Sequence, residues 1–151
     1  MSEPDPATVD SGVVELINDR RAIDGFEARM LEAVDRAGFS KVSRFAIRLA
    51  TEEALMNAFK HGHKGLPPTV PVRIEYSITP ERVVVVIEDR GPGFTPDAVA
   101  DPTLDENLET PTGRGLMLMR AYLTRVEHNP AGNSVKMTYL RPETDTQDAN
   151  A

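Results

Sequence analysis

The spacing of apolar residues predicts two helices in the first half of the chain. Apolar side chains recur every three or four positions over residues 20–37, which places them on one helical face. They are Ile23, Phe26, Met30, Leu31, Val34 and Ala37. Gly38 is a good stop for this helix and Ser40 a good N-cap for the next, because a serine hydroxyl satisfies unpaired N–H groups. We expect the second helix over residues 41–61, ended by one of two following glycines.

Strict alternation of apolar and polar residues over 72–78 predicts a half-buried strand. A turn at residues 79–81 leads from it into a second strand over 82–89. The apolar run from Val83 to Ile87 has no polar alternation, so we expect this strand to be central and covered on both faces.

Shorter patterns complete the expected elements. Residues 13–17 form an apolar run that fits an edge strand, and residues 126–128 and 134–140 fit the two strands of a last hairpin. Residues 116–123 can form a third helix. Residues 90–112 are rich in Gly, Pro, Asp and Thr and have no strong pattern, and a stretch this long in a small domain is usually a functional lid.

Helices on one side of a mixed, largely antiparallel sheet make an α+β two-layer sandwich. The 151 residues fit one domain with one core, placed at 12–141 between disordered tails at 1–11 and 142–151. The lack of cysteine excludes a disulfide scaffold, a Cys-ligated metal site and a thiol nucleophile. No apolar stretch is long enough to span a membrane and the first residues lack signal-peptide features, so a cytoplasmic location is expected.

The formal net charge of −7 is unevenly distributed along the chain. Eleven of the 24 acidic residues lie in 1–10, 95–112 and 142–151, which contain no Lys or Arg. The rest of the chain therefore holds 13 acids against all 17 basic residues and is mildly basic. This balance suits an anionic small ligand or an acidic partner, and no basic stripe points to nucleic acid.

Two polar residues of the expected second helix share a face with its apolar residues. Glu53 and Asn57 lie one turn apart. The apolar arc around them contains Val42, Ala46, Leu49, Ala50 and Ala54. A carboxylate and an amide aimed at a core are costly unless they are paired or wetted by a ligand. One interpretation is a core polar pair satisfied by backbone or buried water; the other is a general base and a Mg²⁺ ligand facing a pocket.

Other residues of the same helix leave their roles open. Leu55 and Phe59 fall on its otherwise polar side, where they would contact the first helix or a second subunit. His61 and His63 near its end could suggest a metal, but no third ligand matches them. A capping or solvated role is the favoured interpretation of both histidines.

Two glycine-containing motifs are candidates for ligand contact. Asp89, Gly91 and Gly93 follow the buried strand, where a carboxylate can accept from a ligand amine and glycines let a ligand approach the backbone. An ordinary turn is the alternative. Gly113 and Gly115 open the expected third helix, where unpaired N–H groups favour phosphate; a plain glycine-rich loop is the alternative.

Together, the order and spacing of these motifs resemble the GHKL (Bergerat-fold) ATPase superfamily. The shared pattern is Glu-x-x-x-Asn on a helix, Asp-x-Gly-x-Gly after a strand, a lid, and Gly-x-Gly before a helix. Within that superfamily, residues 53–62 and 113–120 look like the small anti-sigma factor serine/threonine kinases. The resemblance covers roughly residues 12–140 and implies the histidine kinase-like ATPase fold.

The resemblance implies a role for each matching residue. Glu53 corresponds to the general base that acts on a substrate hydroxyl, and Asn57 to the Mg²⁺-binding asparagine. Asp89 corresponds to the acceptor for the adenine amino group. Gly91 and Gly93 would shape that pocket.

The phosphates and the lid are matched by later residues. Gly113 and Gly115 correspond to the glycines at the triphosphate, with residues 95–112 as the ATP lid. Two positions depart from the family pattern. Asn133 stands near adenine where members often have Thr, and Pro111 stands where some kinases have a lid arginine, for which Arg114 could compensate.

The function that the resemblance implies is an ATP- and Mg²⁺-dependent anti-sigma factor serine/threonine kinase. Such a protein holds a sigma factor and phosphorylates an anti-anti-sigma (STAS-type) antagonist, and family members form homodimers. Neither direct nucleic-acid binding nor membrane association is expected. The alternatives are a nucleotide-gated binding module without useful catalysis and a detached histidine-kinase catalytic domain.

Overall fold

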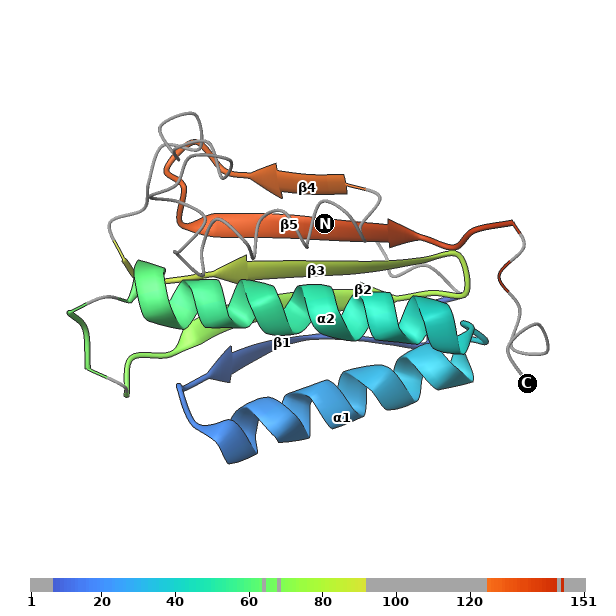
Figure 1. Cartoon of the computed structure of the whole chain (residues 1–151), viewed down its shortest axis with the longest axis horizontal. Helices are drawn as coiled ribbons and strands as arrows, with labels where there is room; N and C mark the ends of the chain where they lie inside the picture. Colours follow the sequence, from blue (N-terminus) through green and yellow to red (C-terminus); the bar gives the residue numbers. More distant parts are fainter. Residues whose placement is uncertain (1–6, 64, 68, 92–124, 144, 146–151) are drawn as a thin grey trace, which may run out of the picture.

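A computed structural model of the chain shows a two-layer α+β sandwich (Figure 1). It describes residues 7–63, 65–67, 69–91, 125–143 and 145. Within this part of the chain, two long helices lie on one face of a five-stranded sheet. The expected fold class is confirmed, but all four strand pairings are antiparallel, so the described sheet is not mixed.

The sheet has the strand order β1-β2-β3-β5-β4. Its strands are β1 (Asp10–Leu16), β2 (Val72–Ile78), β3 (Arg82–Glu88), β4 (Arg125–His128) and β5 (Ser134–Leu140). The prediction of β1 as an edge strand and β3 as the central strand is therefore confirmed. The two expected hairpins are also present, because β2 pairs with β3 and β4 pairs with β5.

The central strand β3 is not covered equally on its two faces. Its alternate residues Val83, Val85 and Ile87 are buried beneath the helices, whereas Val84 and Val86 are only partly buried. The expectation of full cover on both faces is therefore wrong for β3. Five consecutive apolar residues reflect the strong β-propensity of Val and Ile here as well as burial.

Helix α1 (Arg20–Arg36) buries the apolar face that its spacing predicts. The side chain of Asp19 caps its N-terminus by accepting a hydrogen bond from the Ala22 N–H at 3.2 Å. Helix α2 (Lys41–Asn57) begins in the same way, since the Ser40 hydroxyl accepts from the Ser43 N–H at 3.1 Å. Both helices thus begin with a side-chain cap of a favoured type.

The second helix changes geometry before it ends. After α2 the chain continues as the π-helical turn η1 (Ala58–Gly62), where the sequence pattern predicts a regular α-helix. The backbone N–H of His63 bonds to the Ala58 carbonyl oxygen at 2.9 Å, five residues back. Short π-helical turns are frequent at functional sites.

The buried face of α2 is rotated from the predicted arc. It consists of Ser43, Ala46, Ile47, Ala50, Thr51, Ala54 and Leu55. Val42, a member of the predicted arc, is 66% exposed, whereas Leu55 is fully buried. The reason is that α2 packs against two neighbours, α1 and β3. Its buried face therefore includes residues that face α1 as well as residues that face the sheet.

The C-terminal segment is bound to the turn between the two helices. The Asp145 carboxylate accepts from the Ser40 N–H at 3.1 Å and from the hydroxyls of Ser40 and Ser43. The Arg141 guanidinium donates to the Gly38 carbonyl at 2.7 Å. Asp145 lies in the segment expected to be a loose tail, yet it is buried; residues 146–151 lie outside the described part.

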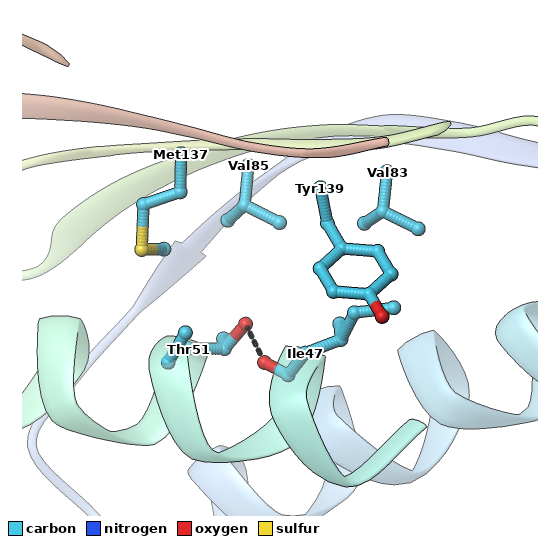
Figure 2. A pocket seen from close by; sticks show the side chains of 7 residues that line it. Ile47, Thr51, Val83, Val85, Met137 and Tyr139 are labelled. Carbon is cyan, nitrogen blue, oxygen red and sulfur yellow. Dashed lines mark hydrogen bonds between the residues drawn. The ribbon is translucent and has the colours of Figure 1, made fainter. Parts of the chain in front are cut away.

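A small cavity lies between α2 and the sheet (Figure 2). Its volume is about 10 Å³ and its lining residues are Ile47, Ala50, Thr51, Val83, Val85, Met137 and Tyr139. The Thr51 hydroxyl donates to the Ile47 carbonyl at 2.8 Å, so its polar group is satisfied within the helix. A space of this size holds at most one water molecule, so it is a feature of core packing and not a ligand pocket.

Candidate functional site

Three segments meet at one end of the sandwich (Figure 1). Helix α2 and strand β3 both run toward this end, and the turn between β4 and β5 lies at the same edge. The Asp89 N–H, directly after β3, donates to the Asn133 carbonyl oxygen at 2.8 Å. The topology therefore brings together predicted site residues from positions far apart in the sequence.

Asp89 presents a half-buried carboxylate at this edge. One of its oxygens, Oδ1, accepts a hydrogen bond from the Gly91 N–H at 2.8 Å. Burial raises the pKa of the Asp89 carboxyl, and the hydrogen bond from the Gly91 N–H only partly opposes that rise. Its other oxygen, Oδ2, makes no hydrogen bond within the described part of the chain and can accept one from a ligand.

Gly62 and Gly91 allow the helix end and the turn after β3 to touch. A Cβ atom added at Gly62 would overlap the Asp89 carboxylate, and one added at Gly91 would overlap the Gly62 carbonyl oxygen. Side chains at either position would therefore push the two segments apart. The sequence predicts close approach at Gly91, but it indicates only a helix stop at Gly62 and not this contact.

His63 also joins the helix end to the turn after β3. Its imidazole Nε2 accepts a hydrogen bond from the Arg90 N–H at 2.8 Å, and its ring lies edge-on to Phe59 with centroids 5.8 Å apart. His63 is the C-cap residue of η1 and is buried, so of its two favoured interpretations the capping role is confirmed and the solvated role is wrong. The described residues contain no group of three His, Asp or Glu side chains that could hold a metal ion.

Glu53 and Asn57 lie one turn apart on α2 and are both half-buried. Neither side chain makes a hydrogen bond or an ion pair within the described residues. The neighbouring Glu52 differs, because it accepts from the Arg20 guanidinium at 2.7 Å. Within the described residues no backbone group satisfies either side chain, which leaves water or a ligand as their partner.

The β4–β5 turn has its own hydrogen-bond network. The Asn129 side-chain oxygen accepts from the N–H groups of Asn133 and Ser134 at 3.0 and 3.1 Å. Gly132 has a φ of 75°, in the left-handed region that glycine adopts at little cost. The network fixes the Asn133 backbone, and through its carbonyl the position of Asp89.

Several predicted site residues lie outside the described residues. They are Gly93, Gly113, Arg114 and Gly115, together with the expected lid at 95–112 and the expected helix at 116–123.

Among the residues that are described, no helix is long and apolar enough to cross a membrane.

Comparison with known proteins identifies the family of the domain. The sequence profile of the histidine kinase-like ATPase domain matches residues 20–139. The chain is also 28% identical over 104 residues to the serine-protein kinase RsbW of Staphylococcus aureus, in strains bovine RF122 / ET3-1, MRSA252 and JH9. That similarity covers 64% of this chain and 65% of each relative, slightly less than two thirds of their length. Since the profile matches most of its length, the chain belongs to the histidine kinase-like ATPase domain family.

Proposed function

We propose that this protein binds ATP with Mg²⁺ at the shared end of α2 and β3, and that it is an anti-sigma factor serine/threonine kinase. The main support for this proposal is a set of polar side-chain groups at this end of the domain that have no partner among the described residues. The Glu53 and Asn57 side chains and the second oxygen of Asp89 have no protein partner in the described residues. A ligand that satisfies them would remove the cost of leaving half-buried polar groups unpaired.

The environment of Asp89 suits an adenine ring. The Gly91 N–H holds Oδ1, which leaves Oδ2 to accept a hydrogen bond from the exocyclic amino group of adenine. Gly62 and Gly91 let the helix end pack directly against the turn after β3, and this packing holds the Asp89 carboxylate in place.

Asn57 would provide one ligand for Mg²⁺. A side-chain carbonyl is a typical hard-oxygen ligand, and Mg²⁺ usually takes its remaining ligands from water and substrate phosphates. We assign the phosphate contacts to Gly113, Arg114 and Gly115, on the basis of the glycine-rich motif before the expected helix. Bound Mg-ATP supplies the phosphoryl group and the metal charge for the reaction.

Glu53 would act as the general base. In this role its carboxylate takes the proton from a serine or threonine hydroxyl as that oxygen bonds to the γ-phosphorus and ADP leaves. Phosphoryl transfer depends mainly on positioning and on neutralising charge, so one carboxylate near the hydroxyl is sufficient protein chemistry. The half-buried position of Glu53, one turn before Asn57, suits this task.

The proposed partners follow from the resemblance to the anti-sigma factor kinases. They are a sigma factor and an anti-anti-sigma protein of the STAS type, with a homodimer as the working unit. The similarity to a serine-protein kinase supports a hydroxyl as the phosphate acceptor. A cytoplasmic location without direct nucleic-acid or membrane contact fits these partners.

A phosphotransfer assay tests the proposed reaction. The wild type and Glu53→Gln would be incubated with Mg-ATP labelled at the γ-phosphate and with STAS-type proteins encoded in the same genome. We expect an acid-stable phosphoprotein with the wild type and at least a hundredfold less product with Glu53→Gln, the scale of general-base catalysis. Glu32→Gln, the same change at an exposed position of α1, is the matched control and should retain activity.

Other outcomes of this assay would support a different function. An acid-labile product would indicate phosphohistidine and a detached histidine-kinase domain. ATP binding without transfer to any such protein would indicate a nucleotide-gated binding module. Full activity of Glu53→Gln would contradict the assignment of the general base.

A further inference from the structure

We propose that His63 is a positioning residue for adenine recognition, because its Nε2 atom fixes the turn that carries Asp89. This inference rests on the proposed ATP site and assigns to it a residue that does not touch the nucleotide. His63 lies just beyond η1, and Arg90 lies 27 positions further along the chain. The hydrogen bond between them joins two segments that both border the site.

The turn after β3 is held from two sides. On the sheet side, the Asp89 N–H donates to the Asn133 carbonyl oxygen at 2.8 Å. On the helix side, the next N–H, that of Arg90, donates to His63 Nε2 at 2.8 Å. The third N–H, that of Gly91, orients the Asp89 carboxylate by donating to its Oδ1. Each of three successive N–H groups thus has one defined acceptor.

The imidazole is itself held in a single orientation. It is buried, and the edge-on contact with Phe59 restricts rotation of the ring. The π-helical turn contributes as well, because the bond from the His63 N–H to the Ala58 carbonyl fixes the backbone of His63. An Nε2 acceptor requires the neutral imidazole with its proton on Nδ1, so the contact also fixes the tautomer.

Loss of this acceptor would leave the Arg90 N–H without a partner and loosen the turn. Asp89 would then be aimed less accurately at the adenine amino group. The effect on binding should therefore be specific to the base. ATP, which has the amino group, should lose affinity, whereas ITP, which has an oxygen in its place, should lose little.

The test compares wild type, His63→Leu and His63→Gln, using calorimetric titration with Mg-ATP and with Mg-ITP. We expect His63→Leu to weaken ATP binding about five- to tenfold, the scale of one hydrogen bond, and to reduce the preference for ATP over ITP by a similar factor. His63→Gln should restore most of the preference, because its side-chain oxygen can accept from the Arg90 N–H. Equal weakening of both nucleotides, or an unchanged preference in His63→Leu, would overturn the proposal.

A second readout does not depend on nucleotide binding. In ¹⁵N-labelled wild type the His63 imidazole should show the Nδ1–H tautomer, and the Arg90 amide should exchange slowly with solvent. The Arg90 amide should exchange faster in His63→Leu and regain protection in His63→Gln. Failure of the wild type to bind ATP would overturn the proposed function, while an unchanged Arg90 amide in His63→Leu would overturn the positioning role of His63.

Discussion

Glu27 is a buried acid on α1, and its side chain faces both Arg20 and Glu52. Burial, followed by the neighbouring Glu52, raises the pKa of Glu27 to about 8. The Glu52 carboxyl has its pKa lowered instead, mainly by the hydrogen bond from Arg20. Near neutral pH Glu27 is therefore protonated while Glu52 is ionised, so the two side chains can lie next to each other between α1 and α2 without repulsion between two negative charges.

Glu27→Gln should make the protein more stable at alkaline pH. A raised pKa in the folded state means that Glu27 stabilises the fold at low pH and that this contribution disappears as pH rises from about 4.5 through about 8. Glutamine keeps the shape and a hydrogen-bond donor without the buried charge. We expect the variant to gain stability over the wild type steadily above about pH 4.5, with a gain about 1–3 kcal/mol larger at pH 9 than at pH 6.

Urea denaturation at pH 6, 7.5 and 9 measures this difference, and Glu52 remains ionised over that range because its pKa is lowered. Glu32→Gln on the exposed face of the same helix serves as the control and should not change the pH dependence. If the free energies of unfolding of wild type and Glu27→Gln changed in parallel from pH 6 to 9, the pKa of Glu27 would not be raised in the folded protein.

Some residues of the candidate site could be predicted from the sequence, whereas His63 could not. Glu53, Asn57 and Asp89 stand out because polar residues interrupt apolar patterns at fixed spacing. His63 could not be assigned, because its partner is a backbone N–H 27 positions away and any residue type could provide that donor. The nearest local signal is Phe59, four residues before His63, which suggests a shared face but no acceptor role.

At the scale of elements, the contact between the end of α2–η1 and the end of β3 shapes the site. Gly62 and Gly91 permit it because neither has a side chain. The elements themselves could be predicted well, since their periodicities are strong. The rotation of α2 and its π-helical end could not, because both depend on packing against α1 and the sheet.

Gly62→Ala should damage the site, whereas Gly25→Ala should stabilise the protein. A Cβ at Gly62 would overlap the Asp89 carboxylate, so we expect loss of ATP binding and destabilisation by about 1–3 kcal/mol. Gly25 lies in the interior of α1, where an added Cβ would meet open space, so alanine there should add about 0.5–1 kcal/mol. Thermal unfolding and ATP titration of both variants measure these effects.

Comparison of Gly62→Ala with Gly25→Ala separates the general effect of replacing a glycine by alanine from the effect of disturbing the contact between Gly62 and Asp89. Unchanged ATP affinity in Gly62→Ala would mean that the helix end and the Asp89 turn do not need to touch.

At the scale of the whole molecule, the C-terminal segment connects the two layers. Asp145 binds the N-terminus of α2, and Arg141 reaches the carbonyl groups of Gly38 and Pro80 in two different turns. The two hairpins and the edge and central strands of the sheet could be predicted from the sequence pattern. This connection could not be predicted, because Asp145 and Ser40 are 105 positions apart and the tail composition resembles that of a disordered segment.

Asp145→Ala should therefore destabilise the whole domain. It removes three hydrogen bonds to Ser40 and Ser43 and leaves buried donors unpaired, at a cost of about 2 kcal/mol. Although burial raises the pKa of Asp145, the hydrogen bonds from Ser40 and Ser43 lower it overall. Its contribution is therefore present at neutral pH and is lost as pH falls through that lowered pKa.

Urea denaturation at neutral and acidic pH measures both effects. Glu143→Ala removes the same charge from an exposed position two residues away and should have almost no effect. Equal stability of the two variants at neutral pH would show that the C-terminal segment does not hold the helix turn.

In the proposed nucleotide site at the end of α2 and β3, Asp89 accepts a hydrogen bond from adenine. Calorimetric titration of Mg-ATP into wild type and Asp89→Asn tests this role. Asparagine places an amide donor in the carboxylate position, so we expect saturable binding to the wild type and at least tenfold weaker binding to the variant. Glu53→Ala, assigned to catalysis, should bind ATP almost as well as the wild type. Absence of binding to the wild type, or equal affinity of wild type and Asp89→Asn, would contradict the proposed site.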